Sequence, residues 1–476
     1  MADVSLPESL PGEPPHKPRR WREIFIWLAG LALLFGGAFW YLYLHDEPPP
    51  DDADLCAAGP MVPDDKNGER FFEGETKGRF DLDAYADAQG VDEGDAYDIL
   101  AGRQFNDAFV AGYLAQVQPC LAQIEAALAQ PFFEFSHPLN IQTLTLPRIS
   151  LMMTSARTLL MAARQAAAHG DYAFAVREIA LAEELARRIA ESHGGILYML
   201  VAVTIDGMAQ KLAVNFLNNP QVPLAVIDSL PQAFQPEINW TPAYQQALRL
   251  EYQFFISGLA SLQQDPKSIS KFTTVKDSWV AYFTTLNLKP NQTRRFSAET
   301  LREGIKAAEL DYAALHHRYP AKLDSEADLD STWKVFLPNG GGRLLHGLTT
   351  IRIYDILTTK QGALAGSRLL QIGLAMRHYY DDHLALPAKL DGLVPQFLSA
   401  VPLDPYNSQP LLYDAARGLI YSVGTSLEDN GGSKFLKMAK DGPNYEDPFS
   451  DKQQPTLQLE FQKPAPAITT PANSAK

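Results

Sequence analysis

The most regular pattern in the chain is an uninterrupted apolar run near its N-terminus. Residues Ile24 to Leu44 cover 21 positions without a charged side chain. At about 1.5 Å per residue such a helix is roughly 30 Å long, which matches the hydrocarbon thickness of a bilayer. A cleaved signal peptide has a shorter apolar core and small residues at its cleavage site, whereas this run ends in the bulky residues Phe39 to Leu44. The pattern therefore predicts a transmembrane helix over 24–44.

Beyond this run, apolar residues recur every three to four positions, which is typical of amphipathic helices. The clearest pair covers Ser150–His169 and Asp171–Ser192, with Gly170 as a helix stop and Asp171 as an N-cap between them. This pair predicts an antiparallel helical hairpin. The same periodicity predicts further helices over Phe109–Gln130, Ile196–Leu217, Pro242–Gln264 and Glu299–His317. We therefore expect a helical domain over residues 106–345.

One of these helices, Ile196–Leu217, is apolar enough to raise the question of a second membrane span. Asp206, Gln210 and Lys211 interrupt its apolar surface. Because polar side chains are costly inside a bilayer, we do not expect this helix to be a second membrane span.

The C-terminal part follows a different pattern. A helix is predicted over Ala363–Asp382, after a joint at Asn339–Gly342, and short apolar segments broken by prolines come next. Alternating apolar segments then predict three strands at Leu411–Tyr413, Leu419–Val423 and Thr456–Phe461. We expect a small α+β module over residues 360–462 and a disordered tail over 463–476. The fold class as a whole is predicted to be mainly α.

Charge divides the chain around the apolar run. Lys17, Arg19, Arg20 and Arg22 precede it, whereas 17 acidic and four basic residues lie between Asp46 and Asp98. Basic flanks stay in the cytoplasm, so residues 1–23 are predicted to be a disordered cytoplasmic tail and the remainder to lie outside. Low hydrophobicity and like charge predict an extended, solvated spacer over 45–105. The acidity also excludes nucleic acid as a partner, because nucleic acid requires a basic face.

The two cysteines, Cys56 and Cys120, both follow the predicted span. In an oxidising compartment such thiols often pair in a disulfide. The sequence leaves both states open, paired and free.

Several motifs in the C-terminal module occur in a recognisable order. The run LPAKLDGLVPQFLSAVPLDPYNSQPLLY (386–413) follows the helix, and LIYSVGTSLEDNGG (419–432) follows the predicted hairpin. This arrangement resembles the globular domain of type II secretion major pseudopilins. The resemblance implies a calcium site in the last loop, with Asp429 as the first candidate ligand and Glu428 and Asn430 next. A second loop acid is left open between Asp441 and Asp447.

The N-terminus departs from that family. A pseudopilin has a Gly immediately before its span and a Glu within it, whereas this chain enters the span through Arg20-Trp21-Arg22-Glu23. We therefore expect neither cleavage by prepilin peptidase nor pilus-like polymerisation. The chain as a whole, including VPDDKNGERFF (62–72), resembles uncharacterised bacterial membrane-anchored envelope proteins, a resemblance that implies no activity.

The sequence contains no Gly-x-Ser-x-Gly, no P-loop, no His-Glu-x-x-His and no Cys-x-x-Cys. We therefore expect a bitopic inner-membrane protein with a periplasmic body that is not an enzyme. It would act as a structural or interaction component of the bacterial cell envelope, linked to secretion or pilus-like machinery, with another envelope protein as its partner. The alternative is a membrane-anchored periplasmic enzyme of the hydrolase type, whose acidic residues meet only in the folded helical domain. A deep pocket with two converging acids would favour the enzyme.

Overall fold

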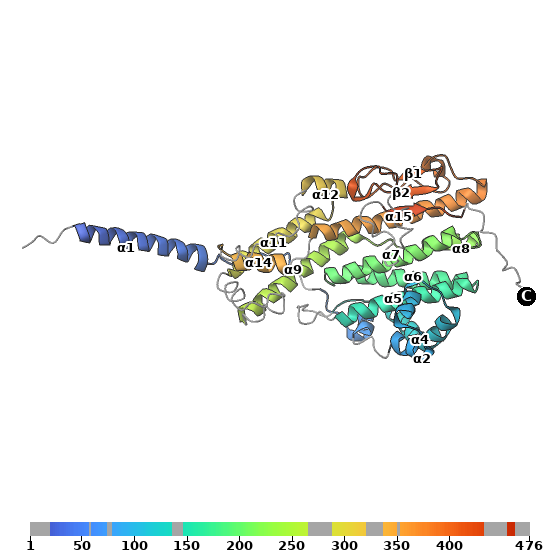
Figure 1. Cartoon of the computed structure of the whole chain (residues 1–476), viewed down its shortest axis with the longest axis horizontal. Helices are drawn as coiled ribbons and strands as arrows, with labels where there is room; N and C mark the ends of the chain where they lie inside the picture. The colour runs from blue at the N-terminus through green and yellow to red at the C-terminus, as the bar shows by residue number, and fades with distance from the viewer. Residues whose placement is uncertain are drawn as a thin grey trace, which may run out of the picture.

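A computed structural model describes residues 20–56, 59–73, 79–135, 146–264, 288–319, 337–349, 353–432 and 455–461. The predicted tail over 463–476 and most of the predicted tail over 1–23 lie outside these residues. The described chain is mainly helical with one three-stranded sheet, which confirms the predicted fold class at this coarse level. Figure 1 shows the first helix projecting from one end of an elongated helical body.

The projecting helix is α1 (Arg20–Phe39), which continues as a π-helical turn, η1 (Trp40–Leu44). The segment Glu23–Leu44 is long and apolar enough to cross a membrane, and none of its most apolar window is buried. The helix α7 (Ile196–Asn218) has a similar length and hydropathy, but 61% of its window is buried within the body. The burial of α7 agrees with the prediction that it is a helix of the body and not a second span.

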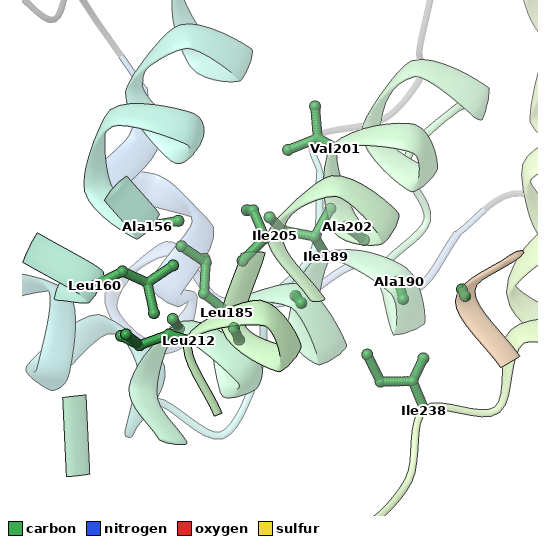
Figure 2. Close-up of a cluster of buried hydrophobic side chains, with 14 of the residues drawn as sticks. Ala156, Leu160, Leu185, Ile189, Ala190, Val201, Ala202, Ile205, Leu212 and Ile238 are labelled. Carbon is green, nitrogen blue, oxygen red and sulfur yellow. The ribbon is translucent and has the colours of Figure 1, made fainter. Parts of the chain in front are cut away.

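The centre of the body is the predicted hairpin, α5 (Leu146–Ala168) and α6 (Tyr172–Glu191), followed by α7. The hairpin turn needs a glycine, because Gly170 has a φ of 80°. The Asp171 side chain then accepts a hydrogen bond from the amide of Phe174, at 3.1 Å, and caps α6. Figure 2 shows the apolar side chains that α5, α6 and α7 bury against one another.

The remaining helices of the body lie around these three. They are α4 (Asp107–Leu128), α9 (Trp240–Gln264), α11 (Pro290–Ala307) and α12 (Tyr312–Arg318), and the unpredicted α8 (Leu224–Ala233). The single helix predicted over Glu299–His317 is wrong, since it is two helices with Asp311 capping the second. The joint predicted at Asn339–Gly342 is also wrong in part, because its glycines open α14 (Gly340–Thr349).

The extended spacer predicted over 45–105 is wrong for the residues that the structure describes. They form two short 3-10 helices, η2 (Asp64–Lys66) and η3 (Gly68–Phe72), and the helices α2 (Leu82–Gln89) and α3 (Glu93–Ala101). Leu55 and Phe72 have no exposed surface and belong to the main core. These scattered apolar residues anchor the segment even though its average hydrophobicity is low.

The acidic side chains at the start of this segment are paired rather than solvated. Asp46 accepts hydrogen bonds from the first amides of α11, at Asn291 and Gln292, over 2.8 and 3.1 Å. The arginines of α11 bind further acids: Arg295 pairs with Glu47, Arg294 with Asp52 and Arg302 with Asp54. The arginines of α11 therefore bind the segment after the span, whose own acidic side chains repel one another.

The cysteines do not pair in the structure. Cys56 is exposed, Cys120 is partly buried, and both are free thiols. The Cys120 thiol instead donates to the carbonyl of Arg79 at 3.2 Å. The disulfide, which the sequence left open, is therefore absent.

The C-terminal part begins with α15 (Ile353–His383), a longer helix than predicted, and continues through η6 (Leu390–Leu393). The strands β1 (Leu412–Asp414), β2 (Leu419–Tyr421) and β3 (Thr456–Gln458) form an antiparallel sheet in that order, at the predicted positions. A 3-10 turn, η7 (Gly424–Ser426), follows β2.

The packing does not separate this part from the helical bundle. A Cβ atom at Gly373 of α15 would lie 2.7 Å from Leu217 of α7 and 2.6 Å from Leu457 of β3. Leu217, Leu457 and Ile372 also belong to one continuous core. The bundle and the C-terminal sheet therefore share their apolar interior, and the predicted boundary between 345 and 360 is not a break in the packing.

Candidate functional site

A cavity lies where α7 and α8 meet α15, and we call it the α7–α15 cavity. Its volume is about 350 Å³, within the range of small-molecule and peptide side-chain pockets. The lining comes from α7, the end of α8 and the loop after it, α15, and the loop after η6. The lining residues are Gln210, Pro231, Phe234, Gln235, Glu237, Ser367, Leu370, Gln371, Leu374, Ala375, His378, Phe397 and Leu398.

The floor of this cavity is apolar, whereas its mouth is polar. Leu370, Leu374 and Leu398 are at most 7% exposed. Gln235, Glu237 and Gln371 are exposed at the mouth. The two kinds of surface give the cavity a place for an apolar group and a polar rim that could orient it.

One polar side chain reaches into the buried part of the cavity. Gln210 is 2% exposed, and its amide nitrogen donates to Asp206 at 2.6 Å. Its amide oxygen is buried and accepts no hydrogen bond from the described residues. A buried acceptor without a donor costs free energy, so this oxygen is suited to receive a donor from a ligand.

Behind Gln210 lies a pair of buried acids, Glu183 of α6 and Asp206 of α7, which are 5% and 3% exposed. Burial raises the pKa of Glu183 well above its usual value, and its hydrogen-bonded neighbour Asp206 raises it further. Two carboxyl groups in contact share one proton, because both cannot ionise at low cost. Neither acid lines the cavity, and Gln210 connects the pair to it.

Two other polar side chains that line the cavity, Ser367 and His378, make longer contacts with acids. The Ser367 hydroxyl donates to Glu237 at 3.4 Å, and Nε2 of His378 lies 3.3 Å from Oδ1 of Asp228. Ser367 and His378 lie eleven positions apart on α15, about 16 Å along the axis at the usual helical rise. They therefore do not form a nucleophile and base pair.

A second group of buried acids lies outside this cavity, where the segment after the span meets the bundle. Arg148 pairs with Glu69 at 3.0 Å and with Glu73 at 2.7 Å. Burial raises the pKa of Glu69 to about 8 against the lowering effect of Arg148. Burial also raises the pKa of Glu251 to about 7, against a hydrogen bond from the amide of Ile196. We interpret this group as structural, since it ties three parts of the chain together and lies outside the α7–α15 cavity.

The predicted calcium ligands lie in the exposed loop after η7. Asp429 accepts hydrogen bonds from the Tyr421 hydroxyl and the Gly431 amide, each at 2.9 Å, and Asn430 donates to Ser426 at 3.0 Å. Glu428 is exposed. Within the described part of the chain no three His, Cys, Asp or Glu side chains come together as metal ligands. Asp441 and Asp447 lie outside the described residues.

The nearby Asp404 has a different role. It is 1% exposed and accepts hydrogen bonds from Ser422, at 2.9 Å, and from the amide of Val423, at 2.8 Å. These bonds fix the Asp404-Pro405 turn to the end of β2.

Sequence reasoning singled out Asp206 and Gln210 only as polar interruptions of α7, and it missed Glu183. A signal was present, because Glu183 lies within the buried stripe of α6, four residues after Ile179 and three before Ala186. An acid at such a position requires a partner on the facing helix. That the partner is Asp206 depends on how α6 and α7 pack.

The class that emerges is a mainly helical protein with a small sheet, an N-terminal helix that could anchor it in a membrane, and one amphipathic cavity. Comparison with protein-family models, with curated proteins and with solved structures found no match.

Proposed function

We propose that this chain is a bitopic inner-membrane protein, with a cytoplasmic N-terminus and a periplasmic body, that binds another protein of the bacterial cell envelope. The α7–α15 cavity would receive a polypeptide segment of that partner. The observation that carries the proposal is the lining of the cavity, where the amides of Gln210, Gln235 and Gln371 surround an apolar floor. Side-chain amides both donate and accept, as peptide groups do.

The membrane topology rests on the basic flank before the span and the acidic flank after it. An alkaline phosphatase fused after Lys476 should therefore be active, because the enzyme folds only outside the cytoplasm. A fusion that is inactive there, while a cytoplasmic reporter at the same position is active, would reverse the topology.

The binding proposal is tested by photocrosslinking in intact membranes. A photoreactive residue in place of Gln371 or Gln235 should give the same polypeptide adduct from both positions. The matched control is Gln123, which is exposed on α4 and outside the cavity. Ser367→Trp should abolish the adduct, because the indole would fill the cavity. An adduct of equal yield from Gln123, or one unaffected by Ser367→Trp, would contradict the proposal.

The resemblance of residues 360–462 to major pseudopilins extends this proposal to secretion or pilus-like machinery. The partner would then be an envelope component of such a machine. Identification of the crosslinked polypeptide by mass spectrometry tests the extension separately from the cavity itself.

A second candidate is a membrane-anchored periplasmic enzyme of the hydrolase type. The observation in its favour is the proton-sharing pair Glu183 and Asp206, which Gln210 connects to the cavity. A panel of ester, peptide and glycoside substrates tests it. Hydrolysis that Asp206→Asn abolishes, with the fold intact by circular dichroism, would replace the binding proposal, whereas a panel without turnover would remove this candidate.

A further inference from the structure

The buried wall of the α7–α15 cavity contains a hydrogen-bond acceptor without a donor. Gln210, which is 2% exposed, lines the cavity, and its amide oxygen accepts no hydrogen bond from the part of the chain that the structure describes. Its amide nitrogen is already engaged with Asp206. Because a buried acceptor without a donor costs free energy, an occupant of the cavity that brings an N–H donor to Gln210 would be stabilised there.

The charged side chains that line the cavity favour a cation as the source of that donor. Glu237 is exposed at the mouth, where the Ser367 hydroxyl donates to it at 3.4 Å and no cation of the described chain pairs with it. Among the described lining residues, His378 alone can carry a positive charge, and its ring lies 3.3 Å from Asp228. The mouth therefore offers a carboxylate that an incoming cation can pair with.

The buried acids behind the cavity add to this negative potential. Glu183 and Asp206 share a proton, so the pair retains a net negative charge. Burial raises the pKa of Glu183, and the charges of Asp206 and Glu237 raise it further, which places Glu237 within electrostatic range of the pair. Arg187 opposes these acids, but it also pairs with two acids of its own helix. A cation in the cavity is therefore attracted both from the mouth and from behind the wall.

We propose that the α7–α15 cavity receives a lysine side chain of the partner polypeptide, an inference that rests on the binding function proposed above. The four-carbon stem of the lysine lies against the apolar floor, as such stems do on apolar surfaces. Its ammonium has three donors and no acceptor, and Gln210 and Glu237 line the cavity with acceptors for it. Lysine is favoured over arginine because the buried acceptor is the single amide oxygen of Gln210, whereas the planar fork of arginine matches acceptors with two oxygens.

The test is zero-length crosslinking with a water-soluble carbodiimide, in the same membranes that are used for photocrosslinking. The reagent joins a carboxyl group to an adjacent amine as an amide, with loss of water, so it reports a lysine in contact with a carboxylate. We expect mass spectrometry to find Glu237 joined to a lysine of the polypeptide that the photoreactive residue in place of Gln371 also captures. Ser367→Trp should abolish this amide, because the indole fills the cavity.

The matched control is Asp382, an exposed acid at the end of α15 and outside the cavity. Any amide that Asp382 forms should be unaffected by Ser367→Trp. Glu237→Gln should lower the yield of the photoadduct about two- to fivefold at low ionic strength, the effect of losing one exposed ion pair, whereas Asp382→Asn should leave it unchanged. High salt should reduce the effect of Glu237→Gln, because it screens exposed charges.

The outcomes separate this inference from the binding proposal. A photoadduct without an amide at Glu237, or with an amide that Ser367→Trp leaves in place, would overturn the lysine inference and leave the binding proposal standing. Equal photoadduct yields for Glu237→Gln and Asp382→Asn would also overturn the lysine inference. Absence of the photoadduct from the wild-type cavity would overturn both.

Discussion

The acids that follow the span and the acids inside the helical body meet opposite environments. Asp52 and Asp54 lie against α11, which carries Arg294, Arg295 and Arg302. Glu183 faces another acid, and burial raises its pKa. The difference shows that burial and arginine partners compete at each acid: the contacts of Arg294 outweigh burial at Asp52, whereas burial dominates at Glu183.

The pKa directions follow this difference. Burial raises the pKa of Asp52, but hydrogen bonds from Tyr252 and Arg294, with the charge of Arg294, outweigh it and leave the pKa below its usual value. The hydrogen bond from Arg302 lowers the pKa of Asp54. For Glu69 and Glu251 burial dominates, and their pKa values rise to about 8 and about 7.

The largest expected effect is therefore a stability that falls toward both acid and alkaline pH. Between the usual carboxyl pKa and about 8, the folded state binds more protons than the unfolded state through Glu69 and Glu251, so stability is lost as pH rises. Below about pH 4, Asp52 and Asp54 reverse the sign of the pH dependence of stability. There the unfolded state takes up protons before the folded state does, so stability is lost as the pH falls. We expect a loss on the order of 4 kcal/mol between pH 5 and pH 9, measured by urea unfolding.

Single variants isolate the alkaline side of this profile. Glu251→Gln should flatten the loss of stability between pH 5 and pH 9, since the amide does not titrate. Glu191→Gln, which changes an exposed acid at the end of α6, should leave the slope unchanged. Equal slopes for all three proteins would show that Glu251 does not contribute to the loss.

The next effect concerns the apolar anchor of the acidic segment. Leu55 has no exposed surface, so Leu55→Ala should destabilise the protein by about 3 kcal/mol through lost burial and a cavity. Met61→Ala is the matched control, because Met61 is 91% exposed and the change should cost less than about 0.5 kcal/mol. Equal urea midpoints for both variants would support the prediction of a solvated spacer over 45–105.

A smaller effect is expected at the ion pairs. Arg294→Met leaves Asp52, which is 8% exposed, without its cation and should cost about 2 kcal/mol at neutral pH. Arg302→Met breaks the exposed pair with Asp54 and should cost less than about 1 kcal/mol. The difference should shrink as the pH falls below the usual carboxyl pKa, because protonation removes the charge of Asp52. A difference that persists there would mean that Arg294 acts through packing alone.

The same two regions show what the sequence could and could not predict. Periodicity predicted α5, α6 and α7 because each carries a continuous apolar stripe. The segment 45–105 lacked such a stripe, and its average charge concealed Leu55 and Phe72, the residues that anchor it. The arginines of α11 lie more than 200 positions from the acids they bind, a distance over which composition gives no pairing.

The candidate site was harder to predict from the sequence for a related reason. The α7–α15 cavity is lined by side chains from α7, α8, α15 and two loops, so it has no local motif. The short apolar segments of the C-terminal part, by contrast, predicted the positions of all three strands, because alternation along a strand is a local signal.

The smallest expected effect concerns a third set of acids, in the loop after η7. Unlike Asp52, Asp429 accepts hydrogen bonds from a tyrosine hydroxyl and a backbone amide, and its neighbour Glu428 is exposed. If calcium binds this loop, as the resemblance to pseudopilins implies, binding to the folded state raises stability by about 1.4 kcal/mol at ten times the Kd. We expect millimolar calcium to raise the Tm of the full chain slightly and Asp429→Ala to abolish the rise, with the Tm in chelator nearly unchanged. Asp391→Ala, an exposed acid beside η6, should keep the wild-type response. The full chain is required because α15 packs on α7, so a fragment without the bundle would expose its apolar face. Identical melting of the wild type in calcium and in chelator would rule the site out.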